Sequence, residues 1–309
     1  MKHTSKDVSV LIPAYNCDGY ILKALDSVFS QSERVGQVVI VNDGSTDNTE
    51  DTILSSKYAQ DIDYYKIENS GPGAARNYGI SKAKGDWIAF LDSDDIWINN
   101  HKIQKQLEII NKYEDAVLID GFSVVDWGNK TIRRERIKNG HCSSEFHFTN
   151  AVNATSSVIA SRQAILSVGG FDPSIRFGED RLLWLALSYL GKVYTLEESV
   201  IKKVNSDGNL TSFNEKNFKQ RLLFINAMLS LIKSNETVSD SYITAISFKN
   251  MEEFFKASIK SNNVTLFDIV FKEAAAISTA KLISSRYFPL YLYRQLIGSF
   301  FPFSKQVKK

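Results

Sequence analysis

Three carboxylates close together after an apolar segment give this sequence its strongest indication of chemistry. Asp92, Asp94 and Asp95 directly follow the apolar residues 87–91, with Ser93 between the first two. Carboxylates packed this closely repel one another unless a cation or solvent relieves the repulsion. Their hard oxygen atoms suit Mg²⁺ or Mn²⁺, which usually take one or two protein carboxylates together with substrate phosphates. The segment therefore predicts a divalent-cation site, and the alternative is an acidic turn that begins a helix.

Two other polar segments also follow apolar runs. Residues 42–47 contain Asp43, which could accept hydrogen bonds from a base or ribose, although Asn-Asp-Gly-Ser is also ordinary turn sequence. Residues 69–77 place two glycines before a predicted helix, whose free N–H groups suit an anion. Arg76 stands where a dinucleotide fingerprint would have its third glycine. We interpret Arg76 as a cation directed at phosphate or base, with a plain surface charge as the alternative.

A second acidic pair, Glu179 and Asp180, stands at the start of an apolar helical segment. A carboxylate held beside an acceptor hydroxyl can take its proton as a general base. The alternative is structural, because acidic side chains stabilise helix N-termini through the helix dipole. The sequence around this pair leaves both interpretations open.

The elements that must position these residues alternate between strand and helix. Apolar runs at 8–12, 37–41, 62–67, 87–91 and 116–125 predict strands, and helical periodicity appears at 20–29, 73–83 and 181–190. Pro13 is expected to end the first strand, Asp47 to cap a helix, residues 128–150 to form a hairpin or loop, and residues 154–160 another strand. This order predicts an α/β fold with a mostly parallel sheet flanked by helices. The polar segments would then meet at the carboxyl ends of the strands.

The composition limits the class of protein. The chain has 309 residues, of which 43% are hydrophobic and 23% charged, with a net charge of +2, so we expect no nucleic-acid partner. From residue 214 onward the pattern is helical, which predicts a catalytic domain at 1–210 and a helical region at 211–309. The two cysteines form no disulfide or metal pattern, and no secretory signal is present, so we expect a cytoplasmic setting.

The C-terminal segment 281–309 combines basic and aromatic residues and contains no acidic residue. Its apolar part, 287–303, is interrupted by prolines, Arg294 and Gln295, so we expect no membrane-spanning helix. A basic aromatic helix can instead lie on an anionic membrane surface. The alternative is a helix that packs in the core or forms a homodimer.

Together the segments resemble the family 2 glycosyltransferases of the GT-A fold, of the type that makes bacterial surface polysaccharides. The matching stretches are SVLIPAYN (9–16), VIVNDGSTDNT (39–49), the segment from Asn69 to Asp95, and the segment from Thr155 to Leu187. They occur in the order and at the spacing of that family, and the resemblance covers roughly residues 7–205. A departure occurs at 98–101, where the family often has a proline and this chain reads Ile-Asn-Asn-His.

The resemblance implies a role for each candidate residue. Asp92-Ser93-Asp94 would be the DxD motif, with Asp94 bound to the metal and Asp92 near the ribose or the waters of the metal. Asp180 would be the catalytic base, with Glu179 beside it. The remaining donor-site residues would be Pro13, Ala14 and Tyr15 around the nucleobase, Asp43 on the base, and Arg76 near the base and diphosphate.

The resemblance also implies the reaction. A nucleotide-diphosphate sugar, most commonly a UDP-sugar in this family, would donate its sugar to a hydroxyl of a glycan or lipid-linked oligosaccharide, with inversion and with Mn²⁺ or Mg²⁺ as cofactor. Three alternatives remain open: a haloacid-dehalogenase-type phosphotransferase with Asp92 as nucleophile, a sugar nucleotidyltransferase, and a non-catalytic protein that binds sugar nucleotides. The first would need the motif nearer the N-terminus, and the second a glycine-rich loop where Pro13 stands.

Overall fold

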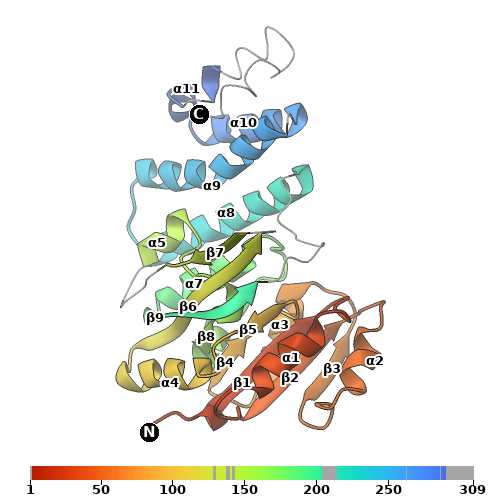
Figure 1. The fold of residues 1–309 in the computed structure, drawn as a ribbon. Coiled ribbons are helices and arrows are strands. Elements are labelled where there is room, and N and C mark those ends of the chain that lie inside the picture. The colour runs from red at the N-terminus through yellow and green to blue at the C-terminus, as the bar shows by residue number, and fades with distance from the viewer. Residues whose placement is uncertain are drawn as a thin grey trace. The chain divides into compact units, whose positions relative to one another are not determined.

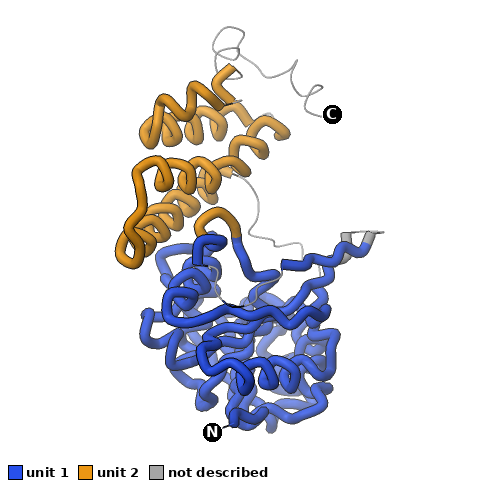
Figure 2. Tube along the Cα trace, turned by 90° about the vertical axis from the view of Figure 1, so that its left-hand side faces the viewer, with its two compact units in different colours: residues 1–146, 150–209 blue, residues 147–149, 210–309 orange. Residues whose placement is uncertain are grey.

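The structure is a computed structural model, and it describes residues 2–127, 130–136, 140, 143–203, 214–261, 263–285 and 287–289. The chain divides into two compact units (Figure 2). Residues 1–146 and 150–209 form the first unit, and residues 147–149 and 210–309 form the second. The candidate site residues all belong to the first unit.

A mixed sheet forms the centre of the first unit (Figure 1). Within the described residues it has nine strands in the order β3-β2-β1-β4-β8-β6-β9-β5, with β7 paired to β6. Strands β3, β2, β1 and β4 are parallel, whereas β8 runs antiparallel to both β4 and β6. The strand bounds are β1 Val8–Ala14, β2 Gln37–Asp43, β3 Asp63–Ile67, β4 Trp87–Phe90, β5 Asp95–Trp97, β6 Ala116–Trp127, β7 Lys130–Arg134, β8 Ile159–Ser161 and β9 Lys192–Lys203.

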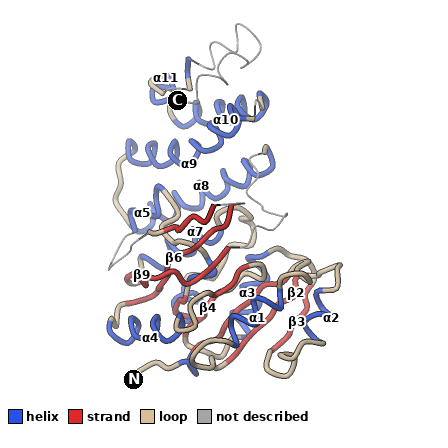
Figure 3. The backbone as a smooth tube through the Cα atoms, in the orientation of Figure 1, coloured by secondary structure: helices blue, strands red, loops and turns tan. Residues whose placement is uncertain are grey.

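Helices cover both faces of this sheet (Figure 3). Val8, Val10 and Ile12 of β1 share a core with apolar residues of α1 and α4, while Leu11 points to the opposite face, close to Gly79 of α3. Side chains alternate along a strand, so a strand that is buried on both faces is apolar throughout. The helices of this unit are α1 Ile21–Phe29, α2 Thr49–Leu54, α3 Pro72–Lys82, α4 Lys102–Lys112, α6 Arg162–Ser167 and α7 Glu179–Ser188, with a short 3-10 turn, η2, at Thr155–Ser157. Helix α5, Ser143–Phe148, begins in this unit, and its residues 147 and 148 are assigned to the second.

The α/β fold predicted from the sequence is confirmed, and the sheet is parallel in its first half and mixed beyond β4. Pro13 does not end β1, which continues to Ala14. Pairing with β4 stops at Leu11, so at Pro13 only β2 lies alongside, and a missing N–H is tolerated where one side has no partner strand.

Two local predictions need correction, and one strand was missed. The segment predicted as a strand at 154–160 is mostly the turn η2, followed by the short strand β8 at 159–161. The cap of α2 is Asn48, although the Asp47 carboxylate does accept the Thr49 N–H at 3.0 Å. Strand β9 was not predicted, because its charged residues interrupt the apolar pattern. Its pairing with β6 contains register shifts.

The second unit is helical, as predicted. Its helices are α8 Glu215–Asn235, α9 Asp240–Lys260, α10 Val264–Ile277 and α11 Thr279–Ile283. Each begins at a side-chain cap, in which the preceding Asn or Ser accepts a backbone N–H of the first turn. Aromatic pairs such as Phe218–Phe254 and Phe255–Phe267 fill the core of this unit.

The prediction for the basic aromatic segment 281–309 falls largely on residues 290–309, which lie outside the described residues. In the part of the chain that the structure describes, no helix is both long and apolar enough to cross a membrane.

Candidate active site

The carboxyl ends of β1, β2 and β4 lie at one edge of the sheet, because these strands are parallel neighbours. The predicted segments follow these ends: Tyr15 after β1, Asp43 at the end of β2, and Asp92 after β4. Ala14 is buried, Pro13 is partly buried and Tyr15 is 50% exposed. The sheet therefore gathers at a single edge the residues expected to bind a donor.

Asp43 is buried and holds the loop that leads into α3. Its Oδ1 accepts the Ser70 N–H at 2.7 Å and its Oδ2 accepts the Gly71 N–H at 2.8 Å. The Asn69 amide also donates to the Asp43 carbonyl oxygen at 3.0 Å. Gly71 has a φ of 90°, which favours glycine there. Asp43 thus fixes the glycine-containing loop at the sheet edge.

A similar link joins the loops after β1 and β2. The Asn16 side-chain oxygen accepts the Thr46 N–H at 2.8 Å, and the Asn16 N–H donates to Ser45 Oγ at 3.1 Å. Asn16 has a positive φ of 47°, a region that asparagine enters more readily than most residues. This role of Asn16 was not predicted from the sequence, although Asn16 ends the first matching segment.

Arg76 brings the two acidic segments together. From α3 its Nη2 donates to Asp92 Oδ1 at 2.7 Å, and its Nη1 donates to Glu179 Oε1 at 3.3 Å. The guanidinium is buried and lies 5.3 Å from the centre of the Phe171 ring. Because Arg76 and Glu179 are 103 residues apart in sequence, only the fold creates this contact.

The charges in this cluster shift one another's pKa values. Burial works against ionisation of Asp92, but Arg76 and Lys203 outweigh it and lower the pKa of Asp92. Burial also works against the charged form of Arg76, but Asp92 and Glu179 outweigh it and raise its pKa. Burial and the neighbouring Asp180 raise the pKa of Glu179 to about 7, against the opposing effect of Arg76. The Arg76 charge therefore faces an ionised Asp92 and a Glu179 that titrates near neutral pH.

A buried serine, Ser156, makes two hydrogen bonds to the segment after β4. Ser156 Oγ accepts the Asp92 N–H at 3.0 Å and donates its own proton to Asp95 Oδ2 at 2.6 Å. Asp95 is 3% exposed, and burial raises its pKa to about 7. Ser93 and Asp94 are partly exposed, and the Ser93 hydroxyl interacts with the Cys17 thiol.

The carboxylates Asp92 and Asp94 fit a hard divalent cation in donor type. Among the described residues, no group of three or more His, Cys, Asp or Glu side chains is arranged to hold a metal. Mg²⁺ commonly takes one or two protein carboxylates and completes its shell with substrate phosphates and waters. A cation here would accordingly need oxygen ligands from a bound phosphate group.

Asp180 lies in the first turn of α7 and is fixed by three donors. Its Oδ2 accepts from the Asn150 amide at 3.3 Å and from Thr155 Oγ1 at 3.2 Å, and its Oδ1 accepts the Arg181 N–H at 2.7 Å. The side chain is partly exposed. The roles of Asn150, Thr155 and Ser156 were not predicted from the sequence, because each is a common polar residue whose role depends on a contact with a distant segment.

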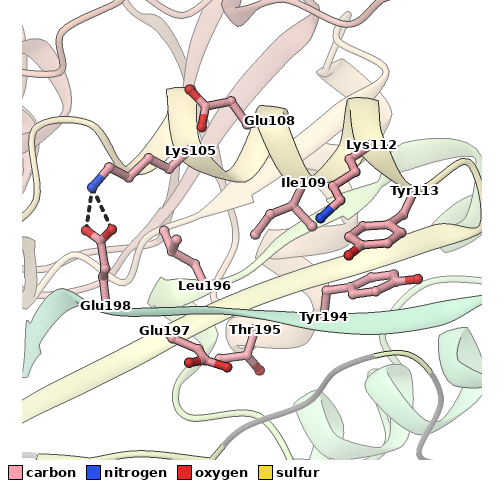
Figure 4. Close-up of a pocket in the computed structure, with 10 residues that line it drawn as sticks. All are labelled: Lys105, Glu108, Ile109, Lys112, Tyr113, Tyr194, Thr195, Leu196, Glu197 and Glu198. Carbon is pink, nitrogen blue, oxygen red and sulfur yellow. Dashed lines mark hydrogen bonds and ion pairs between the residues drawn. The ribbon is translucent and has the colours of Figure 1, made fainter.

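A separate pocket of about 430 Å³ lies between α4 and β9 (Figure 4). Lys105 and Glu198, which both line it, form an ion pair at 2.6 Å, and Tyr113 stacks on Tyr194 with ring centres 4.3 Å apart. None of the residues predicted for the site lines this pocket. It is therefore distinct from the cluster around Arg76.

Comparisons with known proteins point to one family. Residues 9–167 match the family described as glycosyl transferase family 2. An uncharacterized glycosyltransferase of Rickettsia typhi is 27% identical over 84% of this chain and 83% of that protein. The putative teichuronic acid biosynthesis glycosyltransferase TuaG of Bacillus subtilis is 31% identical over 58% of this chain and 71% of that protein. Other relatives are longer, and the chain covers only 31% of one from Rickettsia bellii.

Among solved structures, TarS 1-349 of S. aureus in complex with UDP-GlcNAc has the same fold, with a TM-score of 0.70. The sequences are 17% identical, and the alignment covers 94% of this chain and 87% of TarS 1-349. The match of residues 9–167 spans half of the chain and includes Asp43, Arg76, Asp92 and Asp94. The chain belongs to glycosyl transferase family 2.

Proposed function

We propose that this glycosyltransferase moves a sugar from a UDP-sugar to a hydroxyl of a glycan or lipid-linked oligosaccharide, with inversion at the anomeric carbon. The observation that carries the proposal is the Arg76 contact, which joins the segment after β4 to the start of α7. This contact holds the proposed donor-side carboxylate Asp92 beside the proposed acceptor-side pair Glu179 and Asp180. In this proposal residues 1–210 act as the catalytic domain and residues 211–309 as an accessory helical region.

The donor would bind along the edge formed by β1, β2 and β4. Pro13, Ala14 and Tyr15 would lie against the nucleobase, with half of the Tyr15 side chain exposed for this contact. Asp43 would contact the base while holding the loop of Ser70 and Gly71. TarS 1-349 has the same fold and was solved in complex with UDP-GlcNAc, which supports a nucleotide-sugar donor for this chain.

Asp94 and Asp92, with Ser93 between them, would hold Mn²⁺ or Mg²⁺ near the diphosphate. When bound, the cation would neutralise the charge that develops on the departing nucleotide. Arg76 contributes a fixed positive charge on the same side, and it keeps the Asp92 carboxylate ionised and oriented. A charge fixed before the reaction requires no reorganisation as the transition state forms.

Asp180 would take the proton of the acceptor hydroxyl as the oxygen attacks the anomeric carbon. The hydrogen bonds from Thr155, Asn150 and the Arg181 N–H orient its carboxylate. Glu179 points instead to Arg76, so the two neighbouring acidic residues would serve different purposes. A single displacement with one base inverts the anomeric configuration and needs no covalent intermediate.

Thermal unfolding with a panel of nucleotide diphosphates and their sugars tests the donor site. Each ligand is added with Mn²⁺, with Mg²⁺ and with chelator. A ligand at a hundred times its dissociation constant stabilises a protein by about 2.7 kcal/mol, which raises the melting temperature measurably. We expect metal-dependent stabilisation by UDP and one UDP-sugar. Stabilisation by no member of the panel, with or without metal, would contradict the proposal.

Transfer itself needs a second measurement, because a non-catalytic protein that binds sugar nucleotides would also pass the binding test. Release of UDP from the stabilising donor, in the presence of glycan acceptors, distinguishes the two. We expect release that depends on acceptor and metal. Binding without release on any acceptor would favour the non-catalytic alternative.

We also propose that the basic segment 281–309 attaches the enzyme to the inner face of the cell membrane, where a lipid-linked acceptor would reside. Removal of residues 285–309 should abolish co-sedimentation with anionic vesicles and leave binding to neutral vesicles unchanged. If the truncated chain still sediments with anionic vesicles, the attachment lies elsewhere. A change from dimer to monomer on truncation would instead support the homodimer alternative.

A further inference from the structure

We propose that the buried turn η2, Thr155–Ser157, sets the position of the proposed base relative to the proposed metal-binding segment. In this inference, which rests on the proposed function, Ser156 is a positioning residue for the segment Asp92–Asp95, and Thr155 is a positioning residue for Asp180. The hydroxyls of two consecutive residues in one turn thus contact the two halves of the site: Ser156 the proposed metal-binding segment, and Thr155 the proposed base.

Ser156 is fully buried and uses both its donor and its acceptor capacity on the segment after β4. Its Oγ accepts the Asp92 N–H at 3.0 Å, and its hydroxyl proton goes to Asp95 Oδ2 at 2.6 Å. The backbone of Asp92 and the side chain of Asp95 are therefore both fixed to one oxygen atom. Asp94 stands between these two fixed points, which limits where its carboxylate can lie.

Thr155 points to the other half of the site. Its side chain is buried, and Oγ1 donates to Asp180 Oδ2 at 3.2 Å. The same carboxylate oxygen accepts from the Asn150 amide at 3.3 Å. The other carboxylate oxygen, Oδ1, accepts the Arg181 N–H at 2.7 Å. Loss of Thr155 Oγ1 would allow the carboxylate to rotate away from its present orientation.

The turn itself is held firmly enough to act as a reference point. The Trp97 indole N–H donates to the Ser156 carbonyl at 2.8 Å, and the Gln106 amide donates to the Ser157 carbonyl at 2.8 Å. The next residue, Val158, accepts the Phe90 N–H at 3.0 Å through its carbonyl. Residues of strand β4, strand β5 and helix α4 therefore all hydrogen-bond to the backbone of the turn or of the residue after it.

The experiment compares variants of the two hydroxyls by donor affinity and by turnover. Thr155→Val removes the hydroxyl at nearly constant volume, and Thr155→Ser restores it. Loss of an outer partner that orients a metal ligand typically costs about 10–100-fold in metal affinity or activity. A comparable loss is expected for a hydrogen bond that orients a general base, which itself contributes about 10²–10⁴-fold. We expect Thr155→Val to lower kcat by roughly tenfold or more with the dissociation constant of UDP and metal within about twofold, and Thr155→Ser to recover most of the kcat.

Ser156→Ala should mainly weaken donor binding, whereas Thr155→Val should mainly lower kcat. It frees the Asp92 N–H and Asp95, so we expect metal-dependent binding of UDP to weaken by about tenfold, as seen when such outer partners are removed. The matched control is Ser157→Ala in the same turn. The Ser157 hydroxyl is equally buried but donates to the Ala154 carbonyl, at 2.7 Å, instead of to an acidic segment.

The outcomes separate this inference from the proposed function. If the wild-type protein neither binds UDP nor releases it from a donor, the proposed function fails. If the wild type is active but Thr155→Val, Ser156→Ala and Ser157→Ala lower kcat and UDP affinity alike, the turn has only a structural role and the inference is wrong. Should Ser156→Ala fail to fold, the contrast between Thr155→Val and Thr155→Ser still decides the assignment of Thr155.

Discussion

The Nη2 atom of Arg76 lies 2.7 Å from Oδ1 of Asp92, and both side chains are largely removed from solvent. The same guanidinium also reaches Glu179, so a single cation balances carboxylates from two distant segments. A buried charge is tolerated when it is paired and hydrogen-bonded, but removal of one partner leaves the others uncompensated. Arg76 is therefore both a structural link and part of the electrostatics of the proposed site.

Replacing Arg76 by Met should destabilise the protein strongly. The substitution removes the hydrogen-bonded counter-charge of Asp92 and Glu179, two carboxylates that are largely shielded from solvent, and breaking a buried pair in this way costs about 3–5 kcal/mol. Urea unfolding measures the change. The control is Arg34→Met, which removes an ion pair between exposed side chains, Arg34 and Asp61. Exposed pairs contribute about 0–1 kcal/mol, so equal losses in the two variants would contradict the prediction.

Asp180→Asn and Asp94→Asn should separate catalysis from donor binding. The amide introduced by Asp180→Asn keeps the shape of the side chain but cannot take a proton, so we expect UDP binding near normal and a loss of kcat of at least about a hundredfold.

The amide introduced by Asp94→Asn lacks the charge that a hard cation requires, so metal-dependent UDP binding should weaken. Isothermal titration and UDP release measure the two effects.

Substantial turnover by Asp180→Asn would move the role of base to another group. Glu179 would then be the first to test, because its pKa of about 7 suits proton transfer at neutral pH. Glu179→Gln preserves the size of the side chain and its contact with Arg76. If Asp180 is the base, Glu179→Gln should be clearly more active than Asp180→Asn.

Lys102 should make the stability of the wild-type protein depend on pH. This lysine of α4 is fully buried, donates to Gln106 Oε1 at 2.8 Å and lies 4.2 Å from the centre of the Trp97 ring. Burial lowers its pKa from 10.5 to about 7. Between about pH 7 and pH 10 the unfolded chain therefore binds a proton that the native chain does not. Its contribution to the free energy of unfolding rises with pH, by up to about 1.4 kcal/mol per pH unit.

Lys102→Met removes this group, so its free energy of unfolding should rise less steeply over that pH range than that of the wild type. Urea unfolding at several pH values gives both slopes. The exposed Lys112 of the same helix supplies the control, and Lys112→Met should keep the wild-type slope. Equal slopes for Lys102→Met and wild type would show that Lys102 stays charged in the native protein.

Gly79→Ala should destabilise the contact between α3 and β1. A methyl group on Gly79 would lie 2.1 Å from Leu11 Cδ1, inside a fully buried core. Overpacking of this kind costs about 1–3 kcal/mol, and the gain in helix propensity is about 1 kcal/mol, so we expect a net loss of up to about 2 kcal/mol. Thermal unfolding measures the loss. Gly19→Ala is the control, because nothing lies within 4 Å of the added methyl group.

A double-mutant cycle identifies the cause of that loss. If the clash with Leu11 is responsible, Gly79→Ala combined with Leu11→Ala should cost clearly less than the sum of the single changes. Additive costs would mean that Gly79 matters for another reason, such as the close approach of the α3 backbone to the sheet.

The sequence by itself determined the elements that positioned the proposed donor residues. Val8–Ile12, residues 37–41 and residues 87–91 are apolar runs with short polar segments after them, and such runs form buried parallel strands whose carboxyl ends share an edge. This local pattern was sufficient to predict the first half of the sheet, and helical periodicity predicted the helical C-terminal region. The family was predicted from the resemblance of four longer segments to family 2 glycosyltransferases. It failed where charged residues interrupt the apolar pattern, as in β9, and where a turn replaces a strand, as at Thr155–Ser157.

Only the tertiary structure decided how the two acidic segments meet. Nothing in the spacing of Arg76, Asp92 and Glu179 indicates that one guanidinium contacts both carboxylates, because the contact depends on how α3 and α7 pack beside the end of β4. The same holds for Thr155 and Ser156, whose hydroxyls carry no chemical signature in the sequence. Hydrophobic periodicity reports which face of an element is buried, whereas a hydrogen bond between distant polar groups depends on distances that exist only after the chain has folded.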